Sequence, residues 1–215
     1  MSQIYGKTRW KRFAVVMVPT LAATAAVGVS LAQGALAASF SVSGSSFKVS
    51  ADYLHGDGFT QYGTVLTQVT GVDPTTGKLI SGPLPVAVSG FNTARITNLC
   101  QSVDINTHIV GDYTLTIRAG QDPKNPVTAS KLFIDMTDLK AKTATFNGIN
   151  IGVATGAISK GPVDGDQTVD PTGFAQEADS ADLTGVQQTA WATSAGTFSL
   201  NGMHLSLAAG DAGCF

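Results

Sequence analysis

The chain has almost no glutamate and few charged residues. Glu177 is the only glutamate among 215 residues, and Asp, Glu, Lys and Arg together make up 13% of the sequence. Thr, Ser, Gly and Val are abundant instead, and this bias disfavours helices and suits strands joined by turns. We therefore predict a mostly β protein.

Cysteine is also scarce, which excludes a disulfide-rich scaffold. Only Cys100 and Cys214 are present, and neither belongs to the C-x-x-C pairs that metal sites and redox enzymes use. We expect no metal and no cofactor. In an exported chain the two cysteines are expected to form one disulfide, and a loop of this length would stabilise the fold by about 4 to 5 kcal/mol. The alternative is a reactive thiol beside a second free cysteine.

A long apolar run occurs only near the N-terminus, where it has the pattern of a secretory signal. Residues 13–31 are uncharged, and four basic residues precede them: Lys7, Arg9, Lys11 and Arg12. Ala35-Leu36-Ala37 then offers a small-x-small cleavage site. We predict a signal peptide over residues 1–37, cleavage between Ala37 and Ala38, and a single β-rich domain over residues 38–215. Because the run approaches the roughly 18 residues of a membrane span, an uncleaved anchor is the alternative.

Positive charge is scarce after the predicted cleavage site. Nine Lys and Arg then face fifteen Asp and Glu, a net charge of −6, which argues against nucleic acid as a partner. The mature segment shows no second long apolar run, and no cysteine stands directly after the cleavage site to carry a lipid. We expect a secreted or envelope-associated protein that contacts a membrane only through the N-terminal segment, if that segment is retained.

Two Asn-Gly dipeptides predict hairpins, because Asn and Gly adopt the positive φ angles of two-residue turns. In TATFNGINIGV, a turn at Asn147-Gly148 would pair residues 144–146 with residues 149–151. In GTFSLNGMHLSL, a turn at residues 201–202 would pair residues 198–200 with residues 203–205. Each hairpin would bury one apolar face.

Further strands are predicted at residues 65–69, 84–88, 113–117 and 132–136, and a third hairpin at residues 40–49. The Gly-, Pro- and Asp-rich stretches at residues 72–83 and 120–126 are predicted turns. Apolar-Thr-x-apolar recurs at residues 95–99, 135–139 and 182–186, a weak repeat that would suit stacked β units. We expect an antiparallel β-sandwich or an elongated open β-roll or groove.

The stretch LHGDGF, residues 54–59, is similar to the oxyanion loop of one lipase and esterase family. That chemistry needs a Gly-x-Ser-x-Gly elbow, which the chain lacks. A serine hydrolase on a β fold would have to use His55, His108 or His204 as its base, and each is expected instead at a turn or an exposed strand position. Gly56-Asp57-Gly58 is interpreted as a strand-to-strand turn, with Leu54 and Phe59 in the core. We assign no catalytic residue.

Asp164, Asp166 and Asp170 are spaced as in some calcium loops. The pattern lacks the glycine at the sixth position and the glutamate at the twelfth, so an acidic solvated loop is favoured over weak calcium binding. Trp191 could line a ligand surface, but a partly buried strand aromatic is favoured.

Several stretches resemble a known family: YGKTRWKRF, NLCQSV, LTGVQQTAWATSAGTF and the terminal GCF. In these, and over essentially the whole chain, the sequence resembles actinobacterial, Streptomyces-type exported proteins of unknown function. Members of that family are often labelled cholesterol esterase. The resemblance implies export, and it implies no established fold, active site or substrate.

The favoured hypothesis is a non-enzymatic exported β protein that binds a lipid or another component of the cell envelope through an apolar face or groove. A self-assembling surface protein that associates through strand edges is the first alternative. An esterase with a non-standard site is the second.

Overall fold

The computed structural model describes residues 41–107 and 111–215, and nearly all of its regular structure is β strand. The predicted all-β class is therefore confirmed. The predicted signal peptide, its cleavage site at Ala37 and Ala38, and His108 lie outside the described residues. The described part contains no helix with the length and hydropathy that a membrane crossing needs.

Eleven strands and one short 3-10 helix, η1 (Thr155–Ala157), make up the described fold. The strands are β1 (Ser41–Val42), β2 (Phe47–Val72), β3 (Leu79–Thr97), β4 (Leu99–Thr107), β5 (Gly111–Ala119), β6 (Val127–Lys140), β7 (Thr143–Asn147), β8 (Asn150–Ala154), β9 (Phe174–Ser194), β10 (Thr197–Ser199) and β11 (His204–Ala209). All belong to one sheet, and every pairing is antiparallel except that of β1 with β2.

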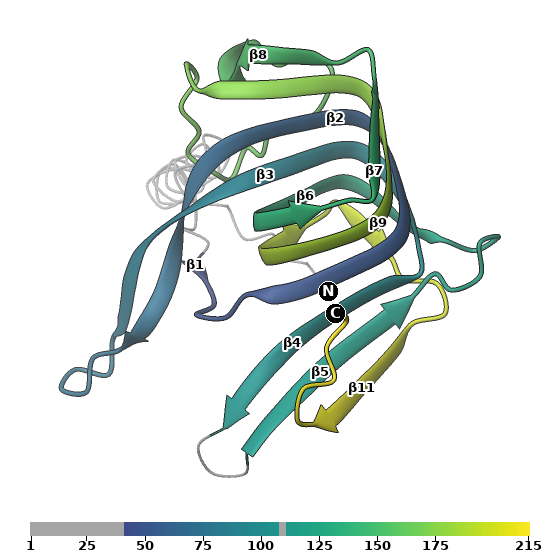
Figure 1. The fold of residues 1–215 in the computed structure, drawn as a ribbon. Coiled ribbons are helices and arrows are strands. Elements are labelled where there is room, and N and C mark those ends of the chain that lie inside the picture. The colour runs from purple at the N-terminus through teal and green to yellow at the C-terminus, as the bar shows by residue number, and fades with distance from the viewer. Residues whose placement is uncertain (1–40, 108–110) are drawn as a thin grey trace, which may run out of the picture. The chain divides into compact units, whose positions relative to one another are not determined.

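The four longest strands close the sheet on itself. β2 pairs with β3, β3 with β6 and β6 with β9, and β9 returns to pair with β2 over residues 175–190. These strands bend together, so the same strand contributes to opposite sides of the ring (Figure 1). The inward face of the ring holds the main hydrophobic cluster, which includes Leu54, Phe59, Phe91 and Leu132. Leu54 and Phe59 are thus buried, as predicted.

β4, β5 and β11 extend the sheet beyond the edge of the ring (Figure 1). The C-terminal segment folds back over them, and the predicted disulfide joins Cys100 at the start of β4 to Cys214. Three strand hydroxyls also hold this segment. Thr114 Oγ1 donates to the Gly210 carbonyl (2.7 Å), Thr116 Oγ1 donates to the Ala212 carbonyl (3.2 Å), and Ser102 Oγ accepts from the Cys214 N–H (3.0 Å). The disulfide therefore fixes a tail that has little buried apolar surface of its own.

The ends of β2 and β3 project from the ring as a two-stranded arm, residues 65–86 (Figure 1). Four large apolar side chains on it are exposed: Val65, Val72, Leu79 and Ile80. Pro83 and Pro85 lie in the part of β3 that pairs only with β2 among the described residues. Because proline has no N–H, it blocks the addition of another strand at that edge.

The hairpin predicted at Asn147-Gly148 is wrong. β7 and β8 both pair with β9, at residues 180–184 and 174–177, and do not pair with each other. Gly148 has a positive φ of 62°, as the Asn-Gly signal requires. At Gly148 the chain does not reverse direction as in a hairpin. It continues along β9, so that β7 and β8 pair with two different segments of that strand.

The two other hairpins are also wrong, although one of the turns is present. Residues 201–202 form a turn, but β10 on one side pairs with β6 and β11 on the other side pairs with β5. At the N-terminal end, β1 pairs with Thr67 and Gln68 of β2 in parallel. The predicted strands at residues 65–69, 84–88, 113–117 and 132–136 are confirmed within β2, β3, β5 and β6.

Candidate ligand-binding cavity

The long strands bend at corners that interrupt their regular alternation. A regular strand directs every second side chain to one face. In β2, however, Ala51 and Leu54 both lie in the inward cluster, and Phe59 is inward three positions after Gly56. A Cβ on Gly56 would lie 2.2 Å from the Phe91 ring, so glycine is required where that ring crosses β2. LHGDGF is therefore the middle of a long bent strand, and its interpretation as a turn is wrong.

The strands that pair with β2 on its two sides bend at positions directly opposite the bend in β2. Tyr53 of β2 pairs with Thr97 on one side and Thr184 on the other, and the residues that follow these two, Asn98 and Gly185, have φ angles of 51° and 57°. A left-handed residue lets the chain turn while the apolar side chains before and after it stay inward.

The weak sequence repeat marks these corners. Its apolar positions, three residues apart, are Ile96 and Leu99, Met136 and Leu139, and Leu183 and Val186. Five of the six line two adjoining cavities in the ring, which are described below, and the sixth, Met136, is in the inward cluster. The predicted stacked units are absent from the described residues, because the three segments lie at bends within one sheet.

The corners leave a cavity of about 220 Å³ inside the ring, the main cavity. Phe59, Phe91 and Phe146 line it, with the Phe59 ring centroid 5.5 Å from that of Phe91 and 5.0 Å from that of Phe146. Leu54, Ile134 and Leu183 contribute aliphatic surface. None of its lining residues is ionisable. An apolar cavity of this kind favours uncharged, hydrophobic occupants.

The exposed lining residues place the mouth of the main cavity where β6 turns into β7. Leu139, at the end of β6, is 36% exposed, and Ala144 of β7 is exposed as well. The other lining residues are buried or half-buried. A ligand would therefore enter past these two side chains.

Polar groups in the lining of the cavity come from two glutamines, Gln61 and Gln188, and from Ser89. Gln61 Nε2 donates to Ser89 Oγ (3.1 Å), and the Gln61 carbonyl accepts from Gln176 Nε2. Gln188 of β9 is 4% exposed and also lines the cavity, yet its side chain forms no hydrogen bond to another described residue. It is the one buried carboxamide of the lining with free hydrogen-bonding capacity among the residues described.

A segment between η1 and β9, residues 158–173, crosses the outer face of β2, and we call it the strap. Its carbonyls at Pro162 and Thr168 accept from Thr60 Oγ1 (2.6 Å) and Thr64 Oγ1 (3.0 Å). Its Asp164 N–H donates to the hydroxyl of Tyr62 (2.9 Å). The strap thus covers the outer side of the sheet whose inner side lines the cavity.

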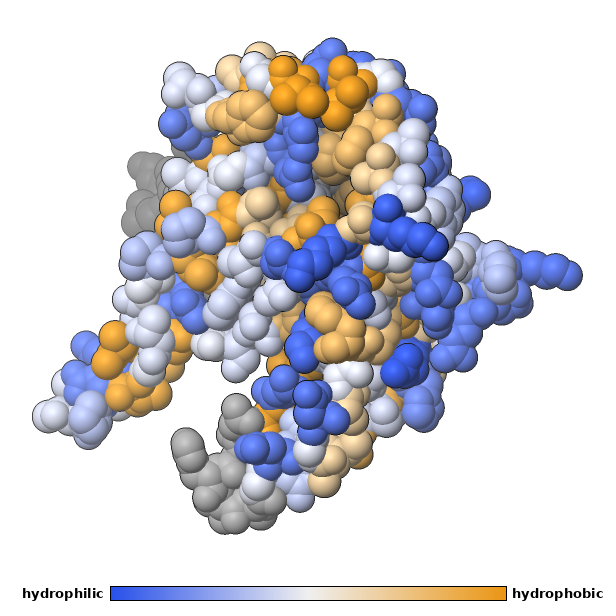
Figure 2. Space-filling view, in the orientation of Figure 1, coloured by the Kyte–Doolittle hydropathy of each residue, from blue (hydrophilic) through white to orange (hydrophobic). Residues whose placement is uncertain are grey.

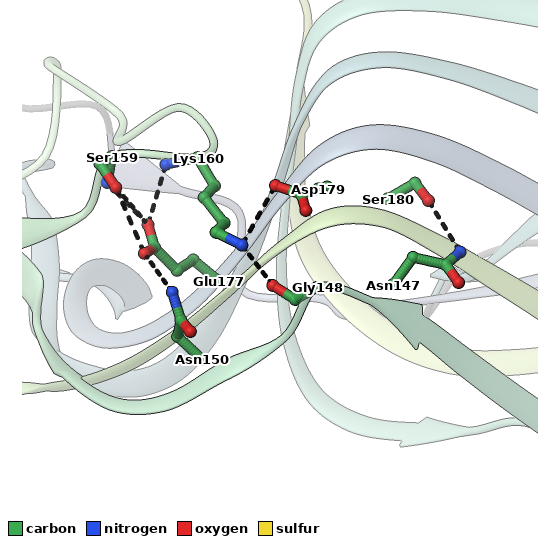
Figure 3. Close-up of polar contacts among 8 residues, drawn as sticks. All are labelled: Asn147, Gly148, Asn150, Ser159, Lys160, Glu177, Asp179 and Ser180. Atoms are coloured by element: carbon green, nitrogen blue, oxygen red, sulfur yellow. Dashed lines mark hydrogen bonds and ion pairs between the residues drawn. The ribbon is translucent and has the colours of Figure 1, made fainter.

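Glu177 anchors the start of the strap (Figure 3). Its carboxylate accepts from the backbone N–H groups of Ser159 (2.7 Å) and Lys160 (2.8 Å) and from Asn150 Nδ2 (3.1 Å). These hydrogen bonds, the Ser159 N–H foremost, lower the pKa of Glu177 to about 2. Lys160 in turn contacts Asp179 (3.1 Å) and the Gly148 carbonyl. The single glutamate of the chain therefore has a structural role.

On the outer face, Asp135 of β6 lies in a row with Tyr62, Val88 and Ala192 beneath the strap. Burial raises the pKa of Asp135 to about 6, although Gln167 Nε2 donates to both of its oxygens (3.1 and 3.0 Å). Gln167 Oε1 is buried without a partner among the described residues. The pair is therefore only partly satisfied.

His204 lies at an exposed strand position, as predicted, whereas His55 is half-buried on β2. His55 Nδ1 is 2.8 Å from Asp182, and its Nε2 is 3.4 Å from Asp57. Tyr53 also donates to Asp182, and the hydrogen bonds from Tyr53 and His55 lower the pKa of that carboxyl. Each ring nitrogen of His55 thus faces a carboxylate, an arrangement that leaves neither of them directed at a serine hydroxyl.

The acidic residues of the suspected calcium loop lie in the strap. Asp164 is buried and accepts from the Asp166 N–H (3.0 Å), which differs from the solvated position expected for it, whereas Asp170 is exposed and holds the Thr172 N–H (2.9 Å). Within the described ranges, no three His, Cys, Asp or Glu residues group as metal ligands. Trp191 is half-buried on β9 and packs against a second hydrophobic cluster, on the outer face of the sheet, that includes Tyr62 and Val88, which confirms the prediction of a partly buried strand aromatic.

Replacing Glu177 by glutamine tests the anchor. The introduced amide would turn an N–H toward a backbone donor, so we expect E177Q to lower the free energy of unfolding at pH 7 by about 2 kcal/mol. Because the folded pKa lies below the ordinary value, this contribution is present above about pH 4.5 and is lost as the pH falls toward 2. Urea unfolding at several pH values measures both effects. The control D179N removes an exposed carboxylate from the same network and should cost less than about 0.5 kcal/mol; equal losses would refute the anchor.

Replacing Asp135 by asparagine tests the buried pair. The folded pKa is raised, so the wild type loses stability as the pH rises from about 4 to about 6. The introduced asparagine and Gln167 can form reciprocal amide hydrogen bonds, and we expect D135N to be more stable than the wild type by about 1 kcal/mol at pH 7.5 and to lack that decline. Urea unfolding from pH 4 to 7.5 measures both effects. D138N is the control, because Asp138 is exposed on the same strand and its replacement should leave the stability unchanged. A less stable D135N at pH 7.5 would contradict this account.

Comparison with known proteins gives a family and no function. No curated protein and no solved structure matches the chain. Residues 43–215, which include all of the ring, the strap and the disulfide-linked tail, match a family described as a family of unknown function, DUF6230. The chain therefore belongs to the DUF6230 family.

Proposed function

We propose that the protein is an exported binding protein that holds a hydrophobic ligand in the main cavity and does not transform it. The observation that carries the proposal is the 220 Å³ cavity, which has an apolar lining, no ionisable lining residue and exposed residues at one end. Ligand sites are concave and mostly apolar, with a few polar groups, and this cavity has that character, although its volume is below the roughly 300 Å³ at which pockets for drug-sized ligands begin.

Export is supported by the N-terminal sequence pattern and is compatible with the disulfide between Cys100 and Cys214. A cell-envelope location would place the protein among lipids and other apolar molecules. The proposal is thus a carrier or sensor of an apolar envelope component.

The two alternatives have weaker support. Self-assembly is favoured by the apolar side chains of the arm, seen as orange atoms at the lower left of Figure 2. Pro83 and Pro85 oppose strand addition there, however. An esterase would need a histidine directed at a nucleophile, and His55 faces Asp182 and Asp57 instead.

Toluene is a suitable first probe, because an apolar cavity of about 150 Å³ accepts benzene. We expect saturation-transfer NMR to detect binding in the millimolar range by the purified mature protein. Ala144→Phe should place a ring in the mouth and reduce binding at least about tenfold, with little change in thermal stability because Ala144 is exposed.

Thr143→Phe is the matched control, since it adds the same ring on the other face of β7, at a residue that does not line the cavity. Wild-type and T143F proteins that bind toluene while A144F does not would support the proposal. Absence of toluene binding, or equal binding by all three proteins, would contradict it.

A further inference from the structure

A second, small cavity adjoins the main cavity. Its volume is about 20 Å³, enough for one water-sized group, which needs roughly 10–15 Å³. The two cavities share four lining residues: Leu54, Ile134, Val186 and Gln188. An occupant of the main cavity could therefore extend one small group past Gln188.

The small cavity has polar side chains at a defined place. Gln101 of β4 and Gln188 of β9 both pair with Val49 of β2, one on each side, so the three form a row across neighbouring strands. Both glutamines line the small cavity, together with Thr193. Gln188 is the glutamine that also lines the main cavity.

Gln188 is a mostly buried residue, 4% exposed, whose side chain has no hydrogen-bond partner among the described residues. Its amide atoms are not among the fully buried polar atoms without a partner, so a water-sized group can reach them from the cavities that Gln188 lines. A ligand group that both donates and accepts would pair with the N–H and carbonyl groups of this carboxamide.

The linings of the two cavities contain no Lys, Arg or His, and no Asp or Glu, among the described residues. An anionic headgroup such as a carboxylate would have to leave water without gaining a counter-charge, and that cost is several-fold larger than the cost for a hydroxyl. The site therefore disfavours an ionised fatty acid.

We propose that the ligand is a neutral amphiphile whose hydrocarbon chain fills the main cavity and whose single uncharged polar group, a hydroxyl in the simplest case, lies in the small cavity against Gln188. This inference rests on the proposed function and specifies its ligand class. By comparison with the cavity that accepts benzene, 220 Å³ suits a chain of about eight carbons.

Three eight-carbon probes test the inference: octanol, octanoate and octane, each titrated calorimetrically at pH 8, where octanoate is ionised. We expect octanol to bind the mature protein at least about tenfold more tightly than octanoate. Gln188→Leu should weaken octanol binding about two- to tenfold, because one or two hydrogen bonds are lost, and should leave octane binding within about twofold.

Gln187→Leu is the matched control, since it makes the same change at the adjacent, exposed position on the opposite face of β9, and it should leave all three affinities unchanged. Octanoate binding as tight as octanol binding, or equal loss of octanol and octane in Q188L, would overturn this inference while the proposed function stands. If neither octane nor octanol binds the wild type, the proposed function fails as well.

Discussion

The structure depends on apolar side chains that remain inward on both sides of each strand corner. A straight strand can bury only every second residue on one face, and four straight strands of this length could not close into a ring. At the corners, the inward residues are three apart, as with Ala51 and Leu54 in β2 and Leu183 and Val186 in β9. Residues with positive φ, such as Asn98 and Gly185, change the direction of the chain at or next to these inward pairs. Closure of the sheet, the buried cluster and the cavity all follow from this constraint.

The corners also explain which parts of the fold could be predicted. Composition and local alternation identified a β protein and four strand cores, because burial on one face leaves a period of two in the sequence. Pairing was not predictable in the same way. Asn147-Gly148 has the local chemistry of a hairpin turn, but β7 and β8 each gain more by pairing with the long edge of β9. The weak repeat was visible in the sequence, and its spacing of three, incompatible with a regular strand, was the signal of a bend.

The candidate site was only partly accessible from sequence. An apolar face for ligand binding was an expectation, and Leu54 and Phe59 were placed in the core correctly. Gln188 carried no signal, because glutamine in a strand usually faces solvent and its burial results from ring closure. Similarly, Glu177 was conspicuous only by its rarity. Its role became clear from the backbone N–H groups of Ser159 and Lys160, which the strap brings to it from a distant part of the sequence.

The central claim is that the bent, closed sheet encloses a cavity that an apolar ligand can occupy. A crystal structure of the mature protein grown with bromooctane tests it most directly, because bromine is located by its anomalous scattering without assumptions about the fold. The account predicts a bromine site inside the ring, within van der Waals distance of Phe146 and Leu183, which line the main cavity. Bromine found only on outer surfaces such as the arm, with the interior of the ring filled by the protein's own side chains, would contradict it.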